Sequence, residues 1–208
     1  MSGVKDYTIL IDLGGVLTED PWETILLTPE IGIADRLGLD RDVVATAGGK
    51  LWELYCRSFM EEEQYWDQMS ELLNIKLPPV LIQEIEKATL KPTHGALEFL
   101  SYLQETKRSW GLVTNNTAFW YSKQLAILGL TGYKLQWEFT SHDDGVVKSD
   151  TGRGLFEIAA ETTDAANTLV IDDRLGNVVR ARSAGFSAVQ YETDCPISLI
   201  ELVNGYSE

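Results

Sequence analysis

The spacing of apolar residues divides the chain into three parts. A contiguous apolar run, Thr8-Ile9-Leu10-Ile11, is typical of a strand that is buried on both faces. Between residues 19 and 89 the apolar positions recur every three or four residues, which is the spacing of amphipathic helices. From residue 91 onward, short apolar runs alternate with helical segments, as in strands joined by crossover helices.

This last part predicts a parallel sheet, because a helical segment separates each strand from the next. The predicted strands cover residues 8–11, 109–114, 136–140, 168–171 and 187–191, and the predicted helices cover residues 95–105, 119–128, 154–160 and 175–184. The expected fold class is therefore α/β, with a doubly wound parallel-sheet core.

The helical stretch at residues 19–90 is too long to be an ordinary loop. We expect an all-helical cap inserted after strand 1, over the carboxyl edge of the sheet, with residues 1–18 and 91–208 forming the core. One cap helix is predicted over residues 43–59, and the next begins with a capping-box pattern formed by Ser58 and Glu61. The aromatic residues of the cap have helical spacing, which favours packing over substrate binding; they include Trp22, Trp52, Tyr55 and Trp66.

Composition narrows the range of partners. The formal net charge is −15 and basic residues are not clustered, so neither nucleic acid nor an anionic membrane is expected to bind. The N-terminal residues do not resemble a signal peptide, and no apolar run is long enough to span a bilayer. The two cysteines, Cys56 and Cys195, lack metal-binding or redox spacing, which favours a cytoplasmic setting. The sequence does not indicate an oligomeric state.

Polar residues follow four of the predicted strands. Since the carboxyl ends of parallel strands meet at one edge of a sheet, these residues should converge on a single crevice. They are Asp12 after the first strand, Thr114 and Asn115 after the second, Lys148 in the loop after the third, and Asp172 and Asp173 after the fourth. Taken alone, an Asp before Gly14-Gly15 is as typical of a turn as of a nucleophile, so only the convergence favours a site.

The converging residue types indicate phosphate chemistry. Carboxylates brought together repel one another, which raises a pKa or requires a cation, and hard oxygen ligands suit Mg²⁺. Lys148 would add a fixed positive charge, and Thr114 and Asn115 would add neutral donors. Such a site matches the charge of a phosphoryl group, and an Asp within it can form an aspartyl-phosphate. We therefore expect Mg²⁺ as the cofactor and a small phosphorylated molecule as the substrate.

Four segments of the chain resemble the motifs of the haloacid dehalogenase (HAD) superfamily, whose members are mostly phosphatases. They are ILIDLGGVL, LVTNN, Lys148 and LVIDDRLGNVVRARSAGF, of which the last is the most specific because Asn177 and Gly185 also match. The resemblance covers nearly the whole chain, and the helical insertion is similar to the cap of that family. It implies a Rossmann-like core and hydrolase activity.

The resemblance also implies a role for each matching residue. It makes Asp12 the nucleophile, while Thr114 and Asn115 bind the transferring phosphoryl group and Lys148 neutralises charge on it. The implied Mg²⁺ ligands are Asp12, the backbone carbonyl of Gly14 and Asp173, with Asp172 supporting the metal directly or through water.

The main departure from the family pattern is Gly14. Phosphatases of the family usually carry a second Asp there, which protonates the leaving group, and general acid–base help is worth about 10²–10⁴ in rate. Three outcomes follow. The leaving group needs no proton, as in a diphosphate or an anomeric phosphate; another residue such as Asp20, His142 or a cap residue supplies the proton; or the protein is a non-catalytic binding protein. The third motif also departs, with Ser149 where Pro is usual and Phe156 later than the usual aromatic.

A haloacid dehalogenase-type hydrolase is the other alternative. The dehalogenases of the superfamily need no metal and lack the Asp pair. Here Asp172-Asp173 is present and would be costly without a cation, which favours phosphate chemistry over carbon–halogen cleavage.

Overall fold

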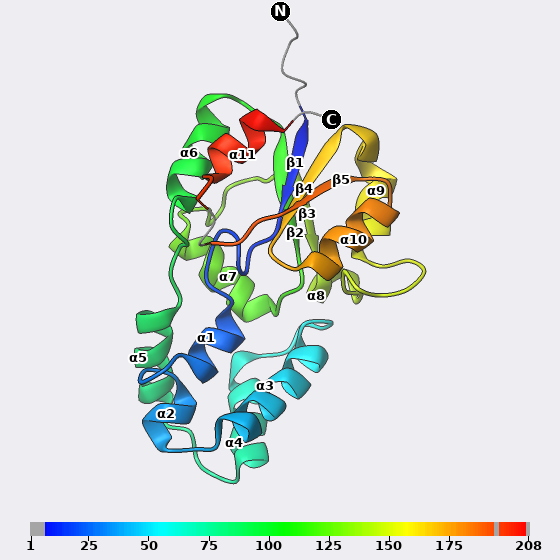
Figure 1. Cartoon of the computed structure of the whole chain (residues 1–208). Helices are drawn as coiled ribbons and strands as arrows, with labels where there is room; N and C mark the ends of the chain where they lie inside the picture. Colours follow the sequence, from blue (N-terminus) through cyan, green and yellow to red (C-terminus); the bar gives the residue numbers. More distant parts are fainter. Residues whose placement is uncertain (1–6, 194–195, 207–208) are drawn as a thin grey trace, which may run out of the picture.

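The computed structural model describes residues 7–193 and 196–206, so Cys195 lies outside the described residues. Its centre is a five-stranded sheet of order β3-β2-β1-β4-β5, in which all neighbouring strands are parallel (Figure 1). The strands are β1 (Thr8–Ile11), β2 (Trp110–Thr114), β3 (Trp137–Thr140), β4 (Thr168–Asp172) and β5 (Ser187–Gln190). The predicted doubly wound α/β core is confirmed.

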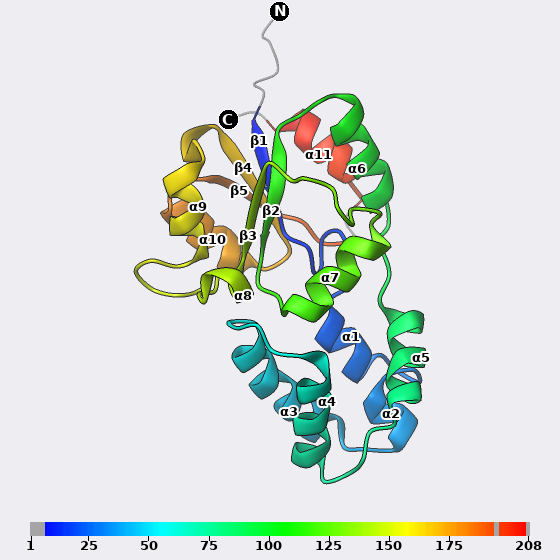
Figure 2. The same ribbon diagram turned by 180° about the vertical axis from the view of Figure 1, so that it is seen from behind.

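The central strands are apolar at successive positions because the sheet is covered on both faces. Ile9 and Ile11 of β1 belong to the core cluster that holds residues of α6 (Ala96–Glu105) and α11 (Leu199–Gly205). Leu10 belongs to a second cluster, with residues of α9 (Leu155–Thr162) and α10 (Leu175–Ser183). Figures 1 and 2 show these two helix pairs on opposite faces of the sheet.

The strand order decides which strand ends become neighbours. β1 lies between β2 and β4, and its register pairs Ile11 with Ile171. The Asp12 N–H donates to the carbonyl oxygen of Ile171 at 2.9 Å, so the ends of β1 and β4 are joined directly. The chain winds through β2 and β3 on one side and through β4 and β5 on the other. The boundary between β1 and β4 is therefore the switch point at which open α/β sheets bind ligands.

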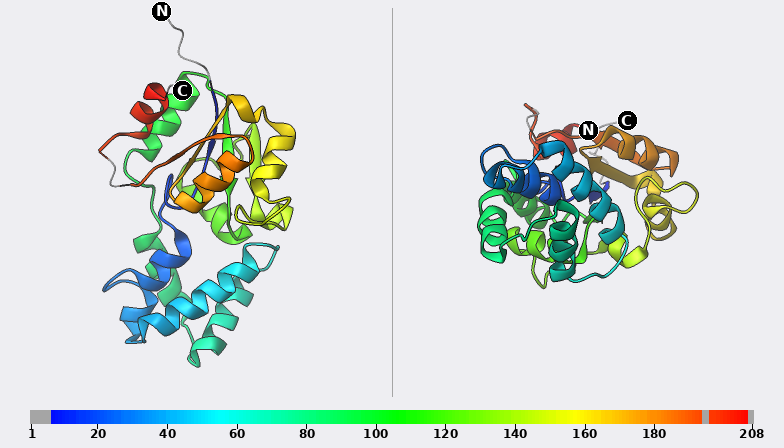
Figure 3. Two further views of the ribbon diagram at one scale, coloured as in Figure 1. Left: turned by 45° about the vertical axis from the view of Figure 1, so that its right-hand side comes forward. Right: turned by 90° about the horizontal axis from the view of Figure 1, so that it is seen from below.

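A helical unit lies beyond the carboxyl ends of the strands (Figures 1 and 3). It consists of α1 (Pro21–Leu27), α2 (Ile33–Leu37), α3 (Arg41–Tyr55), α4 (Glu62–Leu73) and α5 (Pro79–Thr89). It has a hydrophobic core of its own, which includes Ile25, Val44, Leu51 and Ile82. This arrangement is what a cap requires, while the division of the chain after residues 18 and 90 stays a prediction.

The predicted capping box of the helical unit is wrong. α3 ends at Tyr55, and α4 begins at Glu62 after an N-cap, Glu61, that makes no side-chain cap bond. The Ser58 hydroxyl donates instead to the carbonyl oxygen of Leu54 at 3.3 Å. It therefore satisfies the last turn of α3 and is not used at the start of α4.

Three smaller differences concern elements that are too short for periodicity to reveal. A helix, α8 (Ser141–Asp144), stands where the sequence predicts a loop, and Gly145 ends it in the left-handed conformation with φ 70°. The 3₁₀ turn Ala165–Asn167 and helix α11 were not predicted. The remaining core helix, α7 (Ala118–Ile127), follows the prediction closely. In the part of the chain that the structure describes, no helix has both the length and the apolar character needed to cross a membrane.

Candidate active site

A buried ion network lies at the β1–β4 switch point. The Lys148 ammonium contacts Asp12 Oδ2 at 2.6 Å and Asp172 Oδ2 at 2.7 Å, and its side chain is 0% exposed. Asp12 follows β1, Asp172 ends β4, and Lys148 comes from the loop after α8. The structure thus brings together one residue from each of three predicted motifs.

Asp172 has protein partners on both carboxylate oxygens. Oδ2 accepts from Lys148, while Oδ1 accepts from the backbone N–H of Arg174 and from the Asn177 amide, each at 2.9 Å. The residues that follow the strand therefore hold this carboxylate in place. Its geometry suits a group that anchors Lys148 better than a group that is free to bind a ligand.

Asp173 differs from its neighbour because its Oδ1 is buried and has no hydrogen-bond partner among the described residues. Gly15 approaches it closely: a Cβ on Gly15 would lie 2.5 Å from Asp173 Oδ2. Gly15 also has φ 77°, a conformation that favours glycine. The second glycine of the Gly14-Gly15 turn is thus required both by the backbone and by the space that Asp173 occupies.

The three carboxylates form a cluster that could hold a metal ion. Asp12, Asp172 and Asp173 each offer an oxygen atom, and these atoms lie within 4.8 Å of one another. Burial raises the pKa of Asp12 to about 8; Lys148 opposes the rise, and repulsion from Asp172 and Asp173 adds to it. Burial and the charge of Asp172 also raise the pKa of Asp173. The Arg174 guanidinium lies 4.0 Å from Asp173 but also pairs with Asp20 and Glu23. The two cations therefore do not balance the carboxylates, and an additional cation fits both the charge and the unpartnered oxygen.

Lys148 stays charged in this setting. Burial alone would lower the pKa of its ammonium, but the charges of Asp12 and Asp172 and their hydrogen bonds raise it above the usual value. Its backbone N–H donates to Asn115 Oδ1 at 2.9 Å, which ties the loop after α8 to the end of β2. A fixed cation is therefore built into the site.

A polar cavity of about 210 Å³ opens beside this network. The predicted residues that line it are Asp12, Gly14, Asn115 and Lys148. Thr114 is not among the lining residues described; it is 1% exposed, and its hydroxyl donates to the carbonyl oxygen of Asn115 at 3.4 Å. Asp172 and Asp173 also stand outside the lining.

The model of the haloacid dehalogenase-like hydrolase family matches residues 8–185, which include all of these site residues. This chain belongs to that family. A comparison with curated protein sequences gives no significant match.

Three solved structures are similar to the chain in fold. A HAD family enzyme of Bacteroides thetaiotaomicron, in complex with magnesium and inorganic phosphate, has a TM-score of 0.67 at 19% identity over 93% of this chain and 98% of that one. A hydrolase of Pseudomonas syringae has a TM-score of 0.56 at 21% identity over 97% and 87%. The L-2-haloacid dehalogenase of Xanthobacter autotrophicus has a TM-score of 0.60 at 16% identity over 94% and 80%. At these identities the likeness shows the fold alone.

Several residues that line the cavity of this HAD-like hydrolase were not predicted as site residues. Trp52 of α3 reaches the lining and stacks on Trp120 with 5.9 Å between ring centroids, so it both packs and borders the site. Its helical spacing is the same as that of a core residue and carries no separate signal. Asn116, Ser149, Arg174 and Asn177 also line the cavity, and each is a direct neighbour or part of a quoted motif.

Asp20 and His142, the two residues considered as substitutes for the missing Asp, are placed very differently. Asp20 lines the cavity, and burial raises its pKa to about 7, with Glu23 adding to the rise and Arg174 opposing it. His142 is absent from the described lining; its ring packs edge-on against Phe59 at 5.3 Å. His142 therefore has a structural role at the contact between the helical unit and the core.

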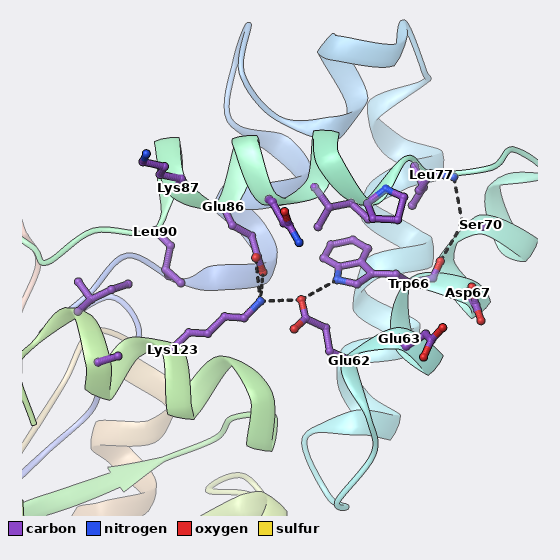
Figure 4. Close-up of a pocket in the computed structure, with 15 residues that line it drawn as sticks. Glu62, Glu63, Trp66, Asp67, Ser70, Leu77, Glu86, Lys87, Leu90 and Lys123 are labelled. Atoms are coloured by element: carbon purple, nitrogen blue, oxygen red, sulfur yellow. Dashed lines mark hydrogen bonds and ion pairs between the residues drawn. The ribbon is translucent and has the colours of Figure 1, made fainter. Parts of the chain in front are cut away.

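A larger cavity of about 940 Å³ lies elsewhere, between α4, α5 and α7 (Figure 4). Its described lining includes neither Asp12 nor Lys148. On its rim, the Lys123 ammonium contacts Glu62 at 2.6 Å and Glu86 at 2.8 Å, which ties α7 of the core to the helical unit. This cavity belongs to the junction between the two parts of this HAD-like chain.

Proposed function

We propose that the chain is a Mg²⁺-dependent phosphohydrolase that acts on a small phosphorylated metabolite. The observation that carries the proposal is the buried network of Asp12, Lys148 and Asp172 beside a polar cavity, with an unpartnered Asp173 oxygen next to it. The complex of the Bacteroides thetaiotaomicron relative with magnesium and inorganic phosphate supports this choice.

The residues that would hold Mg²⁺ are Asp12, Asp173 and the backbone carbonyl of Gly14. Asp172 accepts hydrogen bonds from three donors, whereas Asp12 accepts from two, Lys148 and the Leu13 N–H. Asp172 would therefore support the metal through Lys148 or through water. When bound, the metal supplies positive charge that stabilises the phosphoryl oxygens in the transition state.

The chain's own residues would carry the group transfer. A carboxylate oxygen of Asp12 attacks phosphorus, the bond to the leaving oxygen breaks, and an aspartyl-phosphate forms that water then hydrolyses. Lys148 neutralises charge on Asp12 and on the phosphoryl oxygens. The Asn115 amide adds a hydrogen-bond donor. Thr114, buried at the end of β2 and outside the lining, would support the loop that carries Asn115.

The substrate would be small and polar. The cavity of about 210 Å³ has room for a phosphoryl group and a short leaving group, and most residues around it are polar. Trp52 brings the helical unit up to the cavity, so the unit would exclude bulk water while the bond is broken.

The test is phosphate release from a panel of phosphate esters, measured with the purified protein in Mg²⁺ and again in EDTA. We expect turnover that requires the metal. Metal binding without turnover of any ester would support the non-catalytic alternative, and halide release that EDTA does not inhibit would support a dehalogenase.

A further inference from the structure

The proposed reaction lacks a proton donor for the leaving group, because Gly14 replaces the residue that usually supplies one. We propose that Asp20 is the general acid that protonates the leaving oxygen, reaching the cavity from the opposite side of the turn. This inference rests on the proposed function and adds a catalytic residue to it.

The position of Asp20 is the first argument. A Cβ on Gly14 would lie 3.7 Å from Asp20 Oδ2 and 3.8 Å from Asp20 Cγ, which is ordinary contact distance. The Asp20 carboxyl group therefore occupies the space beside position 14 into which a side chain there would project. Both residues line the same cavity as Asp12, the nucleophile of the proposed reaction.

The backbone gives a second argument. Gly14 is not among the glycines with positive φ, whereas Gly15 is, so the turn does not require glycine at position 14. A Cβ at this position would point at the Asp20 carboxyl group from ordinary contact distance, so a longer side chain there and Asp20 would share one region of the cavity. The Asp20 carboxyl group thus lies where the side chain of the usual Asp at position 14 would project.

The orientation of the Asp20 side chain is the third argument. Asp20 precedes α1 as its N-cap, a position where an Asp usually accepts a backbone N–H, yet it makes no side-chain cap bond. Instead, Oδ2 accepts from the Arg174 guanidinium at 3.0 Å, and Oδ1 is buried without a partner among the described residues. Arg174 is a positioning residue that holds one oxygen, and the other is left without a protein partner at the edge of the cavity that Asp20 lines.

The proton balance is simple. As the Asp12 oxygen bonds to phosphorus, the bond from phosphorus to the leaving oxygen breaks, and that oxygen takes the proton of the Asp20 carboxyl group. In the second step a water oxygen bonds to phosphorus, the bond from phosphorus to the Asp12 oxygen breaks, and the Asp20 carboxylate takes the proton of the water. This frees the Asp12 carboxylate and restores the acid form of Asp20.

The experiment varies the leaving group. In the wild type, single-turnover rates should differ little between 4-nitrophenyl phosphate and an alkyl phosphate. In Asp20→Asn the alkyl phosphate should react about 10²–10⁴-fold more slowly. The 4-nitrophenyl ester, whose leaving group needs no proton, should still give a burst of nitrophenolate, followed by slow turnover.

Two further variants keep the test sharp. Glu19→Gln is the matched control: Glu19 is the exposed neighbour of Asp20 in the chain and does not line the cavity as described, so both esters should react at wild-type rates. The double variant Gly14→Asp/Asp20→Asn moves the acid to position 14. It should hydrolyse the alkyl phosphate at least about tenfold faster than Asp20→Asn does, a gain within the range for general acid help.

The outcomes separate this inference from the proposed function. Equal losses on both esters in a folded Asp20→Asn protein, or no loss on either, would overturn the role of Asp20 alone. A steep dependence of the wild-type rate on the leaving group would do the same without any variant. If the wild type turns over neither ester, both the proposed function and the role of Asp20 fail.

Discussion

Two cavities in the described part of the molecule differ in a way that size alone does not reveal. The larger, of about 940 Å³, has polar groups that already pair with one another, such as Lys123 with Glu62 and Glu86. The smaller, of about 210 Å³, lies beside a fully buried lysine and three carboxylates. Two of its lining residues, Asp20 and Asn116, have buried oxygens without partners in the described part of the chain.

The difference teaches that unbalanced buried charge, and not volume, marks a candidate active site. A buried charge is costly unless it is paired, so an excess of carboxylates persists where something binds them. Among the described residues around the larger cavity there is no such buried excess of charge: Lys123 is one third exposed, and each carboxylate it contacts has a second donor, from Trp66 or Trp120. The predictions below test this contrast from its largest expected effect to its smallest.

The strongest test applies the same change to both cavities. Asp12→Asn should lower phosphate release by on the order of 10⁴-fold or more, because the amide cannot act as the nucleophile. Asp67→Asn, on the rim of the larger cavity, should change the rate by less than about twofold, since it is a surface substitution away from the chemistry. Steady-state rates of phosphate release from one ester measure both effects. Equal losses in Asp12→Asn and Asp67→Asn would contradict the assignment of the smaller cavity as the active site.

Replacing each of the two lysines should change the stability of the protein by different amounts. Lys148→Met leaves the buried Asp12 and Asp172 without their shared cation, which should lower the free energy of unfolding by about 3–5 kcal/mol in EDTA. Lys123→Met should cost about 1 kcal/mol, because Glu62 and Glu86 keep their tryptophan N–H donors. Urea denaturation of both variants measures the difference. A loss from Lys123→Met as large as that from Lys148→Met would contradict the assignment.

The two glycines of the turn should also behave differently. Gly15→Ala meets Asp173 at 2.5 Å and adopts an unfavourable φ, so it should cost about 1–2 kcal/mol and weaken Mg²⁺ binding about 10–100-fold. Gly14→Ala makes only ordinary contacts and should leave both nearly unchanged. Calorimetry of Mg²⁺ binding with thermal unfolding compares the two. A Gly14→Ala protein that binds Mg²⁺ as weakly as Gly15→Ala would refute the role given to Asp173.

The smallest effect concerns the ion pair that joins the helical unit to the core. Arg57 contacts Asp150 with two hydrogen bonds of 2.6 and 2.8 Å, and the hydrogen bond from Arg57 lowers the pKa of Asp150 to about 2. A lowered pKa adds stability that is complete above the unfolded pKa near 4 and is lost as the pH falls through 2. The pair is partly exposed, so it should contribute about 1 kcal/mol or less.

Thermal unfolding of the wild type and Asp150→Asn between pH 6 and pH 2.5 measures this contribution. The difference in melting temperature should shrink as the pH falls. Glu84→Gln removes the acid of an exposed 3.7 Å pair with Arg36 in the helical unit and serves as the matched control, with almost no effect on the melting temperature at any of these pH values. A difference that does not vary with pH would show that Asp150 acts through something other than its charge.

Much of the fold could be predicted because its signals are local. The strand at Thr8–Ile11 and the Asp172-Asp173 pair at the end of β4 follow from apolar runs and from the polar residues that end them. Helices of four residues or fewer, such as α8, were missed because they contain about one turn, too little for a period. The Ser58 cap was wrong because its hydroxyl had a competing acceptor in the preceding helix.

The candidate site likewise contains residues whose placement was predicted from the sequence and residues whose placement was not. Asp12, Lys148 and Asp172 were predicted to converge from the parallel order of their strands, and the structure places them within hydrogen-bonding distance. Thr114 and Asn115 are adjacent in sequence, yet only Asn115 lines the cavity. Thr114 is the last residue of β2 and is buried within the sheet, whereas Asn115 lies in the loop that follows the strand and faces the cavity.

By itself, the sequence determined the parallel sheet, the helical insertion and the set of charged residues at the strand ends, because the apolar period of an element and the polar residue that ends it are set by residues close together in the chain. Only the tertiary structure decided that the Asp20 carboxyl group lies beside Gly14, that Asp173 lies close to Gly15, and that Trp52 lines the cavity. These contacts join segments that lie apart in the sequence, and how close they come in space depends on how the helical unit packs on the sheet. No local pattern of residues encodes that docking, since it depends on packing across the whole molecule.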